Sequence, residues 1–308
     1  MNLNESPSVP ETTRNDEETT MTSSKQSRIS ALPAHLQELL YRRLSGQSER
    51  DTIPPAERTV PLPLSFAQQR LWFLNEFEPD SSEYLTPSAL RLRGELDVAA
   101  LSRALSGLVA RHESLRTTFE SVGGRGVQVI HPPYAVELPV LDLGGLADEE
   151  RGTELDRVLA QEALRPFDLA CGPLLRTRLV RLGAQEHVLT LMLHHIVTDG
   201  WSNGVLLGDL AELYRAELTG TASQLAVLAV QYADFAVWQR DRVSDSVAEE
   251  QLGYWKQQLA SISPLELPTD RPRPVVHTTS GALQEFVVPA SVAGGLRSWG
   301  AVRTARCS

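Results

Sequence analysis

The pattern of apolar and polar positions divides the chain into a polar beginning and a patterned remainder. Residues 1–32 carry almost no large apolar side chains and predict a disordered tail, because such a segment buries too little surface to offset the entropy of ordering. Residues 33–46 place leucines at helical spacing and end in glycine, which predicts a short amphipathic helix. A polar, proline-rich linker follows, so we expect residues 33–60 to form a leader before the main domain.

The main domain, expected over residues 61–275, mixes helical and strand patterns without a repeat. Helices are predicted from Ser65 to before Pro79, from Asp97 to about His112, and over residues 148–164, 202–218, 231–241 and 249–259. Strands are predicted over residues 88–96, 115–120, 126–130, 135–143, 174–182 and 187–195, the last two forming a hairpin around Gly183, Ala184 and Gln185. This irregular order favours an α/β (α+β) fold in which helices flank a mixed sheet.

Polar residues mark several of the expected helix starts. Ser65 followed three residues later by Gln68 is a capping-box signature. Asp97 is expected to cap the next helix, and Ser202 the helix that follows the last predicted strand.

Composition and charge narrow the classes of protein. Of 308 residues, 42% are hydrophobic and 22% charged, which is enough apolar content for a sizeable folded core. The formal net charge of −10 argues against a chain built to bind nucleic acid or anionic lipid, so neither partner is expected.

Cysteine usage and apolar run lengths indicate the cellular setting. Only Cys171 and Cys307 occur, far apart and without a metal-ligand spacing, so we expect neither disulfides nor a metal site. No apolar run approaches the ~20 residues of a membrane helix, and the amino terminus lacks the pattern of a signal peptide. The sequence therefore predicts a cytoplasmic protein.

One short stretch combines several residues that can do chemistry. "LHHIVTDGWS" puts His194 and His195 at the end of an apolar strand, with Asp199 and Gly200 close behind. Side chains alternate across a strand, so one imidazole can face a substrate while the other packs inside. An imidazole at a strand end can take a proton from an amine or hydroxyl, which makes acyl transfer the natural reaction class; from the pattern alone, a structural pair of histidines is equally compatible.

Four stretches together resemble the condensation domains of nonribosomal peptide synthetases, in the order found in that family. They are "SFAQQRLWFL" from Ser65, "RHESLRTTF" from Arg111, "LHHIVTDGWS" from Leu193 and "YADFAVWQR" from Tyr232. The resemblance covers roughly residues 60 to 290. It implies a chloramphenicol acetyltransferase-like lobe, and a tunnel in which an acceptor amine attacks a donor thioester, both delivered by carrier proteins on phosphopantetheine arms. No permanently bound cofactor or metal is implied.

The resemblance also implies roles for single residues of the histidine motif. His195 would be the catalytic residue at the reaction centre, and His194 would be structural. Asp199 would support the motif through an ion pair with Arg70, a bond that arginine makes well. Gly200 would let the backbone approach the pantetheine arm closely.

Other matched residues are given substrate-facing or structural interpretations. Trp201 and Ser202 are expected to face the tunnel or the substrate, although Trp201 could equally be a core aromatic. The remaining matched residues are interpreted as maintaining the fold; they are Arg111, His112, Arg116, Tyr232, Phe235 and Trp238.

The end of the sequence limits what the resemblance implies. Residues 276–308 resemble only the start of the family's second lobe, so we expect that lobe to be largely missing and activity to be impaired. Two further functions stay open: a carrier-protein docking module that no longer catalyses, and a starter condensation domain that transfers a fatty acyl group to the first amino acid. The leader is a candidate contact for an upstream synthetase, and a solvated linker helix is the alternative interpretation.

Overall fold

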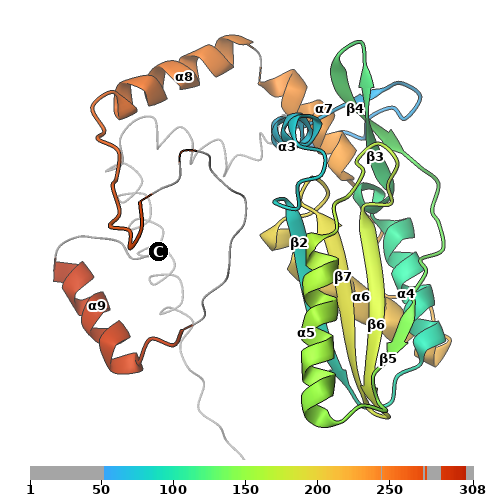
Figure 1. Ribbon diagram of the computed structural model, residues 1–308. Helices are drawn as coiled ribbons and strands as arrows, with labels where there is room; N and C mark the ends of the chain where they lie inside the picture. The colour runs from blue at the N-terminus through green and yellow to red at the C-terminus, as the bar shows by residue number, and fades with distance from the viewer. Residues whose placement is uncertain (1–51, 244, 273–274, 276–285, 303–308) are drawn as a thin grey trace, which may run out of the picture. The chain divides into compact units, whose positions relative to one another are not determined.

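The computed structural model describes residues 52–243, 245–272, 275 and 286–302 (Figure 1). The chain divides into two compact units, Met1–Gln251 and Leu252–Ser308. The predicted tail and leader helix lie outside the described residues.

A four-stranded mixed sheet forms the centre of the first unit. Its strand order is β2 (Leu85–Arg93), β7 (Glu186–His194), β6 (Leu175–Gly183) and β5 (Val140–Asp142). β2, β7 and β6 pair antiparallel, whereas β5 runs parallel to β6. The predicted mixed sheet is therefore confirmed.

The hairpin of β6 and β7 follows the predicted pattern, with Ala184 and Gln185 at its turn. All positions of β7 after Glu186 are buried, because helices cover both faces of the sheet. The strand ends at His194 and not at His195 as predicted. His195 leaves the ladder and donates its backbone N–H to the carbonyl of Tyr84 at 2.8 Å.

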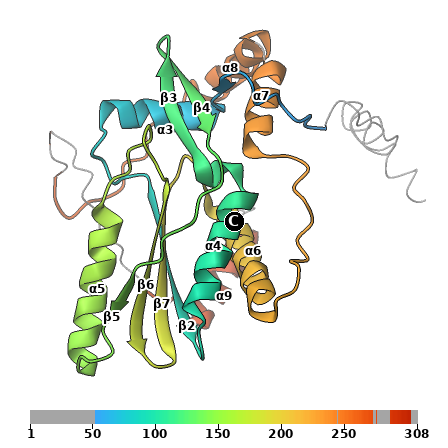
Figure 2. The same cartoon turned by 90° about the vertical axis from the view of Figure 1, so that its right-hand side faces the viewer.

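Helices on the two faces of the sheet enclose two hydrophobic cores (Figure 2). α4 (Val98–Arg111) and α6 (Gly200–Thr219) lie together on one face, and α5 (Asp148–Leu164) lies on the other. The larger core joins leucines of α4, β6 and β7, and the smaller core joins α5 to the opposite face of β6 and β7. Burial of these side chains, at roughly 25 cal/mol per Å² of apolar area, is the main stabilising contribution.

A second, three-stranded sheet lies beyond one end of the first. β1 (Leu62–Pro63) pairs with β4 (Arg125–Ile130), which pairs with β3 (Thr117–Val122). A Cβ atom at Gly126 would lie 2.5 Å from Leu64 and 2.9 Å from Trp72, so only glycine allows this close approach. A 3₁₀ turn, Glu113–Arg116, occupies the beginning of the strand predicted over residues 115–120.

Helices α3 (Phe66–Phe77) and α7 (Tyr232–Arg242) accompany the second sheet, and α8 (Asp245–Leu259) follows. The capping box predicted at Ser65 is present, since its side chain accepts from the backbone of Gln68. Among the described residues of the second unit, α9 (Ala290–Val302) is helical. No helix in the described part of the chain is long and apolar enough to cross a membrane.

Two predicted strands differ by three residues or more from those in the structure. β2 begins at Leu85, three residues earlier than predicted, and includes Pro87. An edge strand tolerates proline because one of its sides needs no ladder hydrogen bonds. Of the strand predicted over residues 135–143, only Val140–Asp142 pairs.

Candidate functional site

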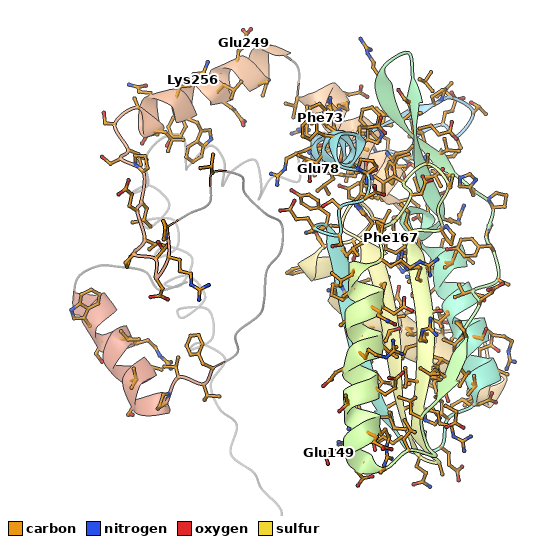
Figure 3. All side chains as sticks on the ribbon, viewed as in Figure 1. Phe73, Glu78, Glu149, Phe167, Glu249 and Lys256 are labelled. Atoms are coloured by element: carbon orange, nitrogen blue, oxygen red, sulfur yellow. The ribbon has the colours of Figure 1, made fainter. Side chains whose placement is uncertain are left out.

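His194 is the last residue of β7 and points into the protein. Only 3% of it is exposed, and its Nδ1 atom accepts a hydrogen bond of 3.1 Å from the backbone N–H of Ile196. The ring of Phe167 meets it edge to face at 6.4 Å, and Figure 3 shows Phe167 just beyond the carboxyl end of α5. Burial, with a smaller contribution from His195, lowers the pKa of His194 to about 4. His194 is therefore a neutral, packed side chain at neutral pH.

His195 is exposed, and its ring is oriented by the backbone. Its Nδ1 atom lies 2.6 Å from the carbonyl oxygen of Thr198. A carbonyl only accepts hydrogen bonds, so Nδ1 carries the proton and donates. The neutral ring then keeps a lone pair on Nε2, which is the form that a general base requires.

Asp199 caps α6, which corrects the prediction that Ser202 does so. Its carboxylate accepts hydrogen bonds from the backbone N–H of Ser202 at 2.7 Å and from the Ser202 hydroxyl at 2.6 Å. These bonds to Ser202 lower the pKa of Asp199. The helix consequently begins at Gly200, two residues before the predicted start.

The predicted ion pair between Asp199 and Arg70 is not formed among the described residues. Asp199 uses its carboxylate within its own helix turn, and Arg70 is exposed on α3. A Cβ atom at Gly200 would meet no protein atom within 4 Å, so the close approach of a pantetheine arm at this position stays a prediction. Trp201 is 87% exposed, which excludes the core interpretation of this side chain in the structure.

A cavity of about 510 Å³ adjoins the motif. His195, Asp199, Trp201 and Ser202 all line it, so the structure brings the exposed residues of the motif together. Most of the other lining side chains are apolar; they include Ala67, Leu71, Val205, Leu206, Leu228 and Val230. An apolar cavity with a few polar groups is typical of a small-molecule site.

Arg111 and His112, which were interpreted from the sequence as maintaining the fold, form a buried ionic cluster with Asp209 beside the same cavity. Asp209 of α6 accepts hydrogen bonds of 2.8 Å from Nε of Arg111 and from Nε2 of His112. Burial lowers the pKa of His112, against an opposing effect of Asp209. His112 also lines the cavity. One sequence signal could have indicated this cluster: Asp209 lies between Leu206 and Leu210, on the apolar face of a predicted helix.

The aromatic residues of α7 pack against one another, as the sequence interpretation expected. Tyr232 and Phe235 lie 5.5 Å apart between ring centroids, and Phe235 and Trp238 lie 5.9 Å apart. Tyr232 also shares a hydrogen bond of 3.0 Å with Ser65, the cap of α3. The bond to Ser65 ties α7 to the start of α3.

A family model described as "Condensation domain" matches residues 59–301. The chain belongs to the condensation domain family. The resemblance to condensation domains of nonribosomal peptide synthetases is thereby confirmed. Among curated relatives, the domain is 48% identical over 262 residues to a linear gramicidin synthase of Brevibacillus parabrevis, covering 84% of this chain and 3% of that protein. It is 44% identical over 259 residues to cyclosporin synthetase of Tolypocladium inflatum, covering 83% of this chain and 2% of the relative.

Solved structures of condensation domains have the same fold. The first condensation domain of the calcium-dependent antibiotic synthetase, in complex with a substrate analogue, matches with a TM-score of 0.60 and 30% identity over 68% of this chain and 51% of that chain. The X-domain from teicoplanin biosynthesis matches with a TM-score of 0.63 and 37% identity over 73% and 49% of the two chains. The predicted chloramphenicol acetyltransferase-like fold class is confirmed, and the chain spans about half the length of these structures.

Within the described residues of this condensation domain, no group of three or more histidine, cysteine or acidic side chains is placed to hold a metal ion.

Proposed function

We propose that this condensation domain forms an amide bond between a donor acyl or peptidyl thioester and an aminoacyl acceptor, each delivered by a carrier protein on a phosphopantetheine arm. The observation that carries the proposal is the orientation of His195. Its Nδ1 atom donates to the carbonyl of Thr198 at 2.6 Å, which leaves Nε2 free as a base beside a cavity.

The reaction balances with His195 as the one group that moves a proton. The acceptor nitrogen attacks the donor carbonyl carbon, a C–N bond forms and the C–S bond breaks. A proton leaves the nitrogen for Nε2 of His195 and then goes to the departing thiolate. General base catalysis of this kind contributes about 10²- to 10⁴-fold to a rate. Holding the two thioesters in position contributes further.

The remaining motif residues support this arrangement without touching the reacting atoms. His194 fills a buried position behind the loop, and Asp199 fixes the start of α6. Trp201 and Ser202 line the cavity, where they face the incoming acyl or aminoacyl group.

The test is a condensation assay with the full chain. Loaded donor and acceptor carrier proteins are mixed with it, and the condensed thioester on the acceptor carrier is detected by mass spectrometry. We expect His195→Ala to lower the rate at least about a hundredfold. The control is His131→Ala, because His131 bonds to Thr118 at the second sheet and does not line the cavity. Equal rates for both variants would exclude His195 as the base.

Two other functions give different results in the same assay. A starter domain would condense only when the donor is a fatty acyl thioester. A docking module would bind carriers but form no product. This outcome is worth testing because the chain is similar to the X-domain, which has been solved in complex with OxyB.

The leader over residues 33–60 is proposed to contact an upstream synthetase. Deleting residues 1–46 should weaken transfer from a carrier-bound donor and leave transfer from a small-molecule thioester unchanged. Equal loss with both donors would point to a folding defect.

A further inference from the structure

The cavity beside His195 contains a second imidazole whose hydrogen bonding leaves one nitrogen unused. Nε2 of His112 lies 2.8 Å from the Asp209 carboxylate, so this nitrogen carries the proton and donates. Among the described residues, Nδ1 of His112 receives no hydrogen bond. A neutral ring protonated on Nε2 has an acceptor lone pair on Nδ1.

The charges around His112 keep it in this form. Asp209 comes from α6, and Arg111 precedes His112 on α4 and bonds to the same carboxylate oxygen. Burial is the largest influence on the pKa of His112 and lowers it. The side chains of His112 and Asp209 are only 14% and 12% exposed, so this hydrogen bond is held in a fixed geometry.

Several of the other polar side chains of the cavity are already engaged, whereas the hydroxyl of Ser114 has no hydrogen-bond partner among the described residues. The amide of Gln231 accepts from the N–H of Glu113 at 3.1 Å and donates to the carbonyl of Arg111 at 2.9 Å. Ser202 and Tyr232 bond to Asp199 and Ser65. Thr198 differs: it is 6% exposed, and its hydroxyl has no hydrogen-bond partner among the described residues. His112, Ser114 and Thr198 therefore offer uncommitted polar atoms in a largely apolar cavity.

The position of the cavity relates it to one part of the substrate. The amine that reacts at His195 is attached to the α-carbon of the acceptor aminoacyl group, and the same carbon carries the side chain. That side chain must therefore lie within a few bonds of His195. A volume of about 510 Å³ is large enough to hold it.

We propose that this cavity binds the side chain of the acceptor aminoacyl group and that His112 selects an uncharged side chain bearing a hydrogen-bond donor. The donor is a hydroxyl or N–H that bonds to Nδ1 of His112, while the apolar walls hold the rest of the side chain. This inference rests on the proposed function, since it assigns a substrate specificity to the same site.

The test uses acceptor pairs that differ by a single hydroxyl: threonyl against valyl, and tyrosyl against phenylalanyl. We expect the full chain to favour the hydroxyl member of at least one pair about tenfold in kcat/KM, the value of one hydrogen bond. In His112→Phe the ratio should fall towards one. His112→Gln, whose amide can donate to Asp209 and still offer an oxygen, should retain part of the preference.

A purely structural role of His112 predicts a different result, because a loosened fold lowers both members of a pair equally. The matched control is Arg103→Ala, which removes a contact between α4 and α6, the 2.6 Å bond to Glu217, away from the cavity. Three results would overturn the proposal. They are no preference in either acceptor pair, an unchanged ratio in His112→Phe, and a preference found only in donor pairs.

Binding without turnover separates this inference from the proposed function. Without a donor thioester, aminoacyl pantetheine amides of the same pairs have no acyl group to accept, so calorimetry with the full chain measures recognition alone. Nitrogen-15 NMR of the His112 ring should show a shift at Nδ1 with the hydroxyl member and none with its partner, and this measurement needs no variant. If condensation fails and this shift is present, the proposed function is wrong and the side-chain site stands. Absence of the shift with both hydroxyl members would refute the site.

Discussion

Nδ1 of His195 donates a hydrogen bond to the carbonyl oxygen of Thr198 three residues later, at 2.6 Å. The bond closes a tight loop between β7 and α6 and decides which ring nitrogen is free. The two neighbours differ in which nitrogen carries the proton: His195 keeps its lone pair on Nε2, whereas His194 accepts at Nδ1 and is protonated on Nε2. Two adjacent, chemically identical side chains thus have opposite protonation patterns because their backbone partners differ.

The buried His194 should make the protein lose stability in mild acid. Its pKa is about 4 in the folded state, against 6.5 for an ordinary histidine, so the unfolded state binds more protons between these values. Stability should fall as the pH drops below 6.5, by about 2 kcal/mol at pH 5 from this group. Urea unfolding at pH 7.5 and pH 5 measures this difference in the free energy of unfolding.

His194→Asn is the matched variant, because its amide oxygen can still accept from Ile196. In this variant the stability lost between pH 7.5 and pH 5 should be about 2 kcal/mol smaller than in the parent. The pKa of His112 is also lowered, and its contribution to the pH dependence should be the same in both proteins. Identical pH dependence of the two proteins would mean that His194 titrates normally.

Asp199 should act as a helix cap and not as an ion-pair partner. Asp199→Ala removes the acceptor for Ser202 and should lower the free energy of unfolding by about 1 kcal/mol. Asp199→Asn keeps an acceptor oxygen and should change it little. Arg70→Ala should stay within about 0.5 kcal/mol of the parent. A loss with Arg70→Ala as large as with Asp199→Ala would restore the ion pair.

Besides their apolar packing, α4 and α6 are joined by two arginine–carboxylate ion pairs, which we expect to differ greatly in strength. Asp209→Ala leaves the largely buried Arg111 without its carboxylate and should lower stability by about 3 kcal/mol. Glu217→Ala breaks a more exposed pair with Arg103 and should lower it by less than about 1 kcal/mol. Thermal or urea unfolding of both variants compares the two losses of stability directly. Equal losses would show that burial does not decide the strength of these ion pairs.

Trp201 should affect catalysis and leave stability unchanged. It is 87% exposed, so Trp201→Ala should shift the free energy of unfolding by no more than about 0.5 kcal/mol. Because Trp201 lines the cavity, Trp201→Ala should raise KM for the acceptor. Unchanged steady-state constants would exclude a contact with the substrate.

Local patterns predicted the elements of the fold well where one signal dominated. The helix over residues 148–164 was predicted with its observed bounds, and Ser65 forms its capping box. The start of α6 was misplaced because Asp199 is followed by glycine, a pair typical of turns as well as of caps. β5 was overestimated because its three paired residues depend on a parallel neighbour, β6, that follows more than thirty residues later.

The candidate site was predictable only in part. The motif identified His195, but the choice between its two ring nitrogens depends on the Thr198 carbonyl, and a backbone carbonyl leaves no mark in a sequence. The His112–Asp209 contact joins residues 97 positions apart, so its chemistry arises only when α4 and α6 pack together.

The backbone N–H of His195 donates to the carbonyl of Tyr84, the residue before edge strand β2. The imidazole proposed as the base is thus anchored next to an edge strand, where local opening is easiest. Amide hydrogen exchange at His195 then reports how often that margin frays. Each opening removes one hydrogen bond from the loop that orients the ring, so we expect the local opening free energy of β2 to contribute to how long the proposed base stays in position.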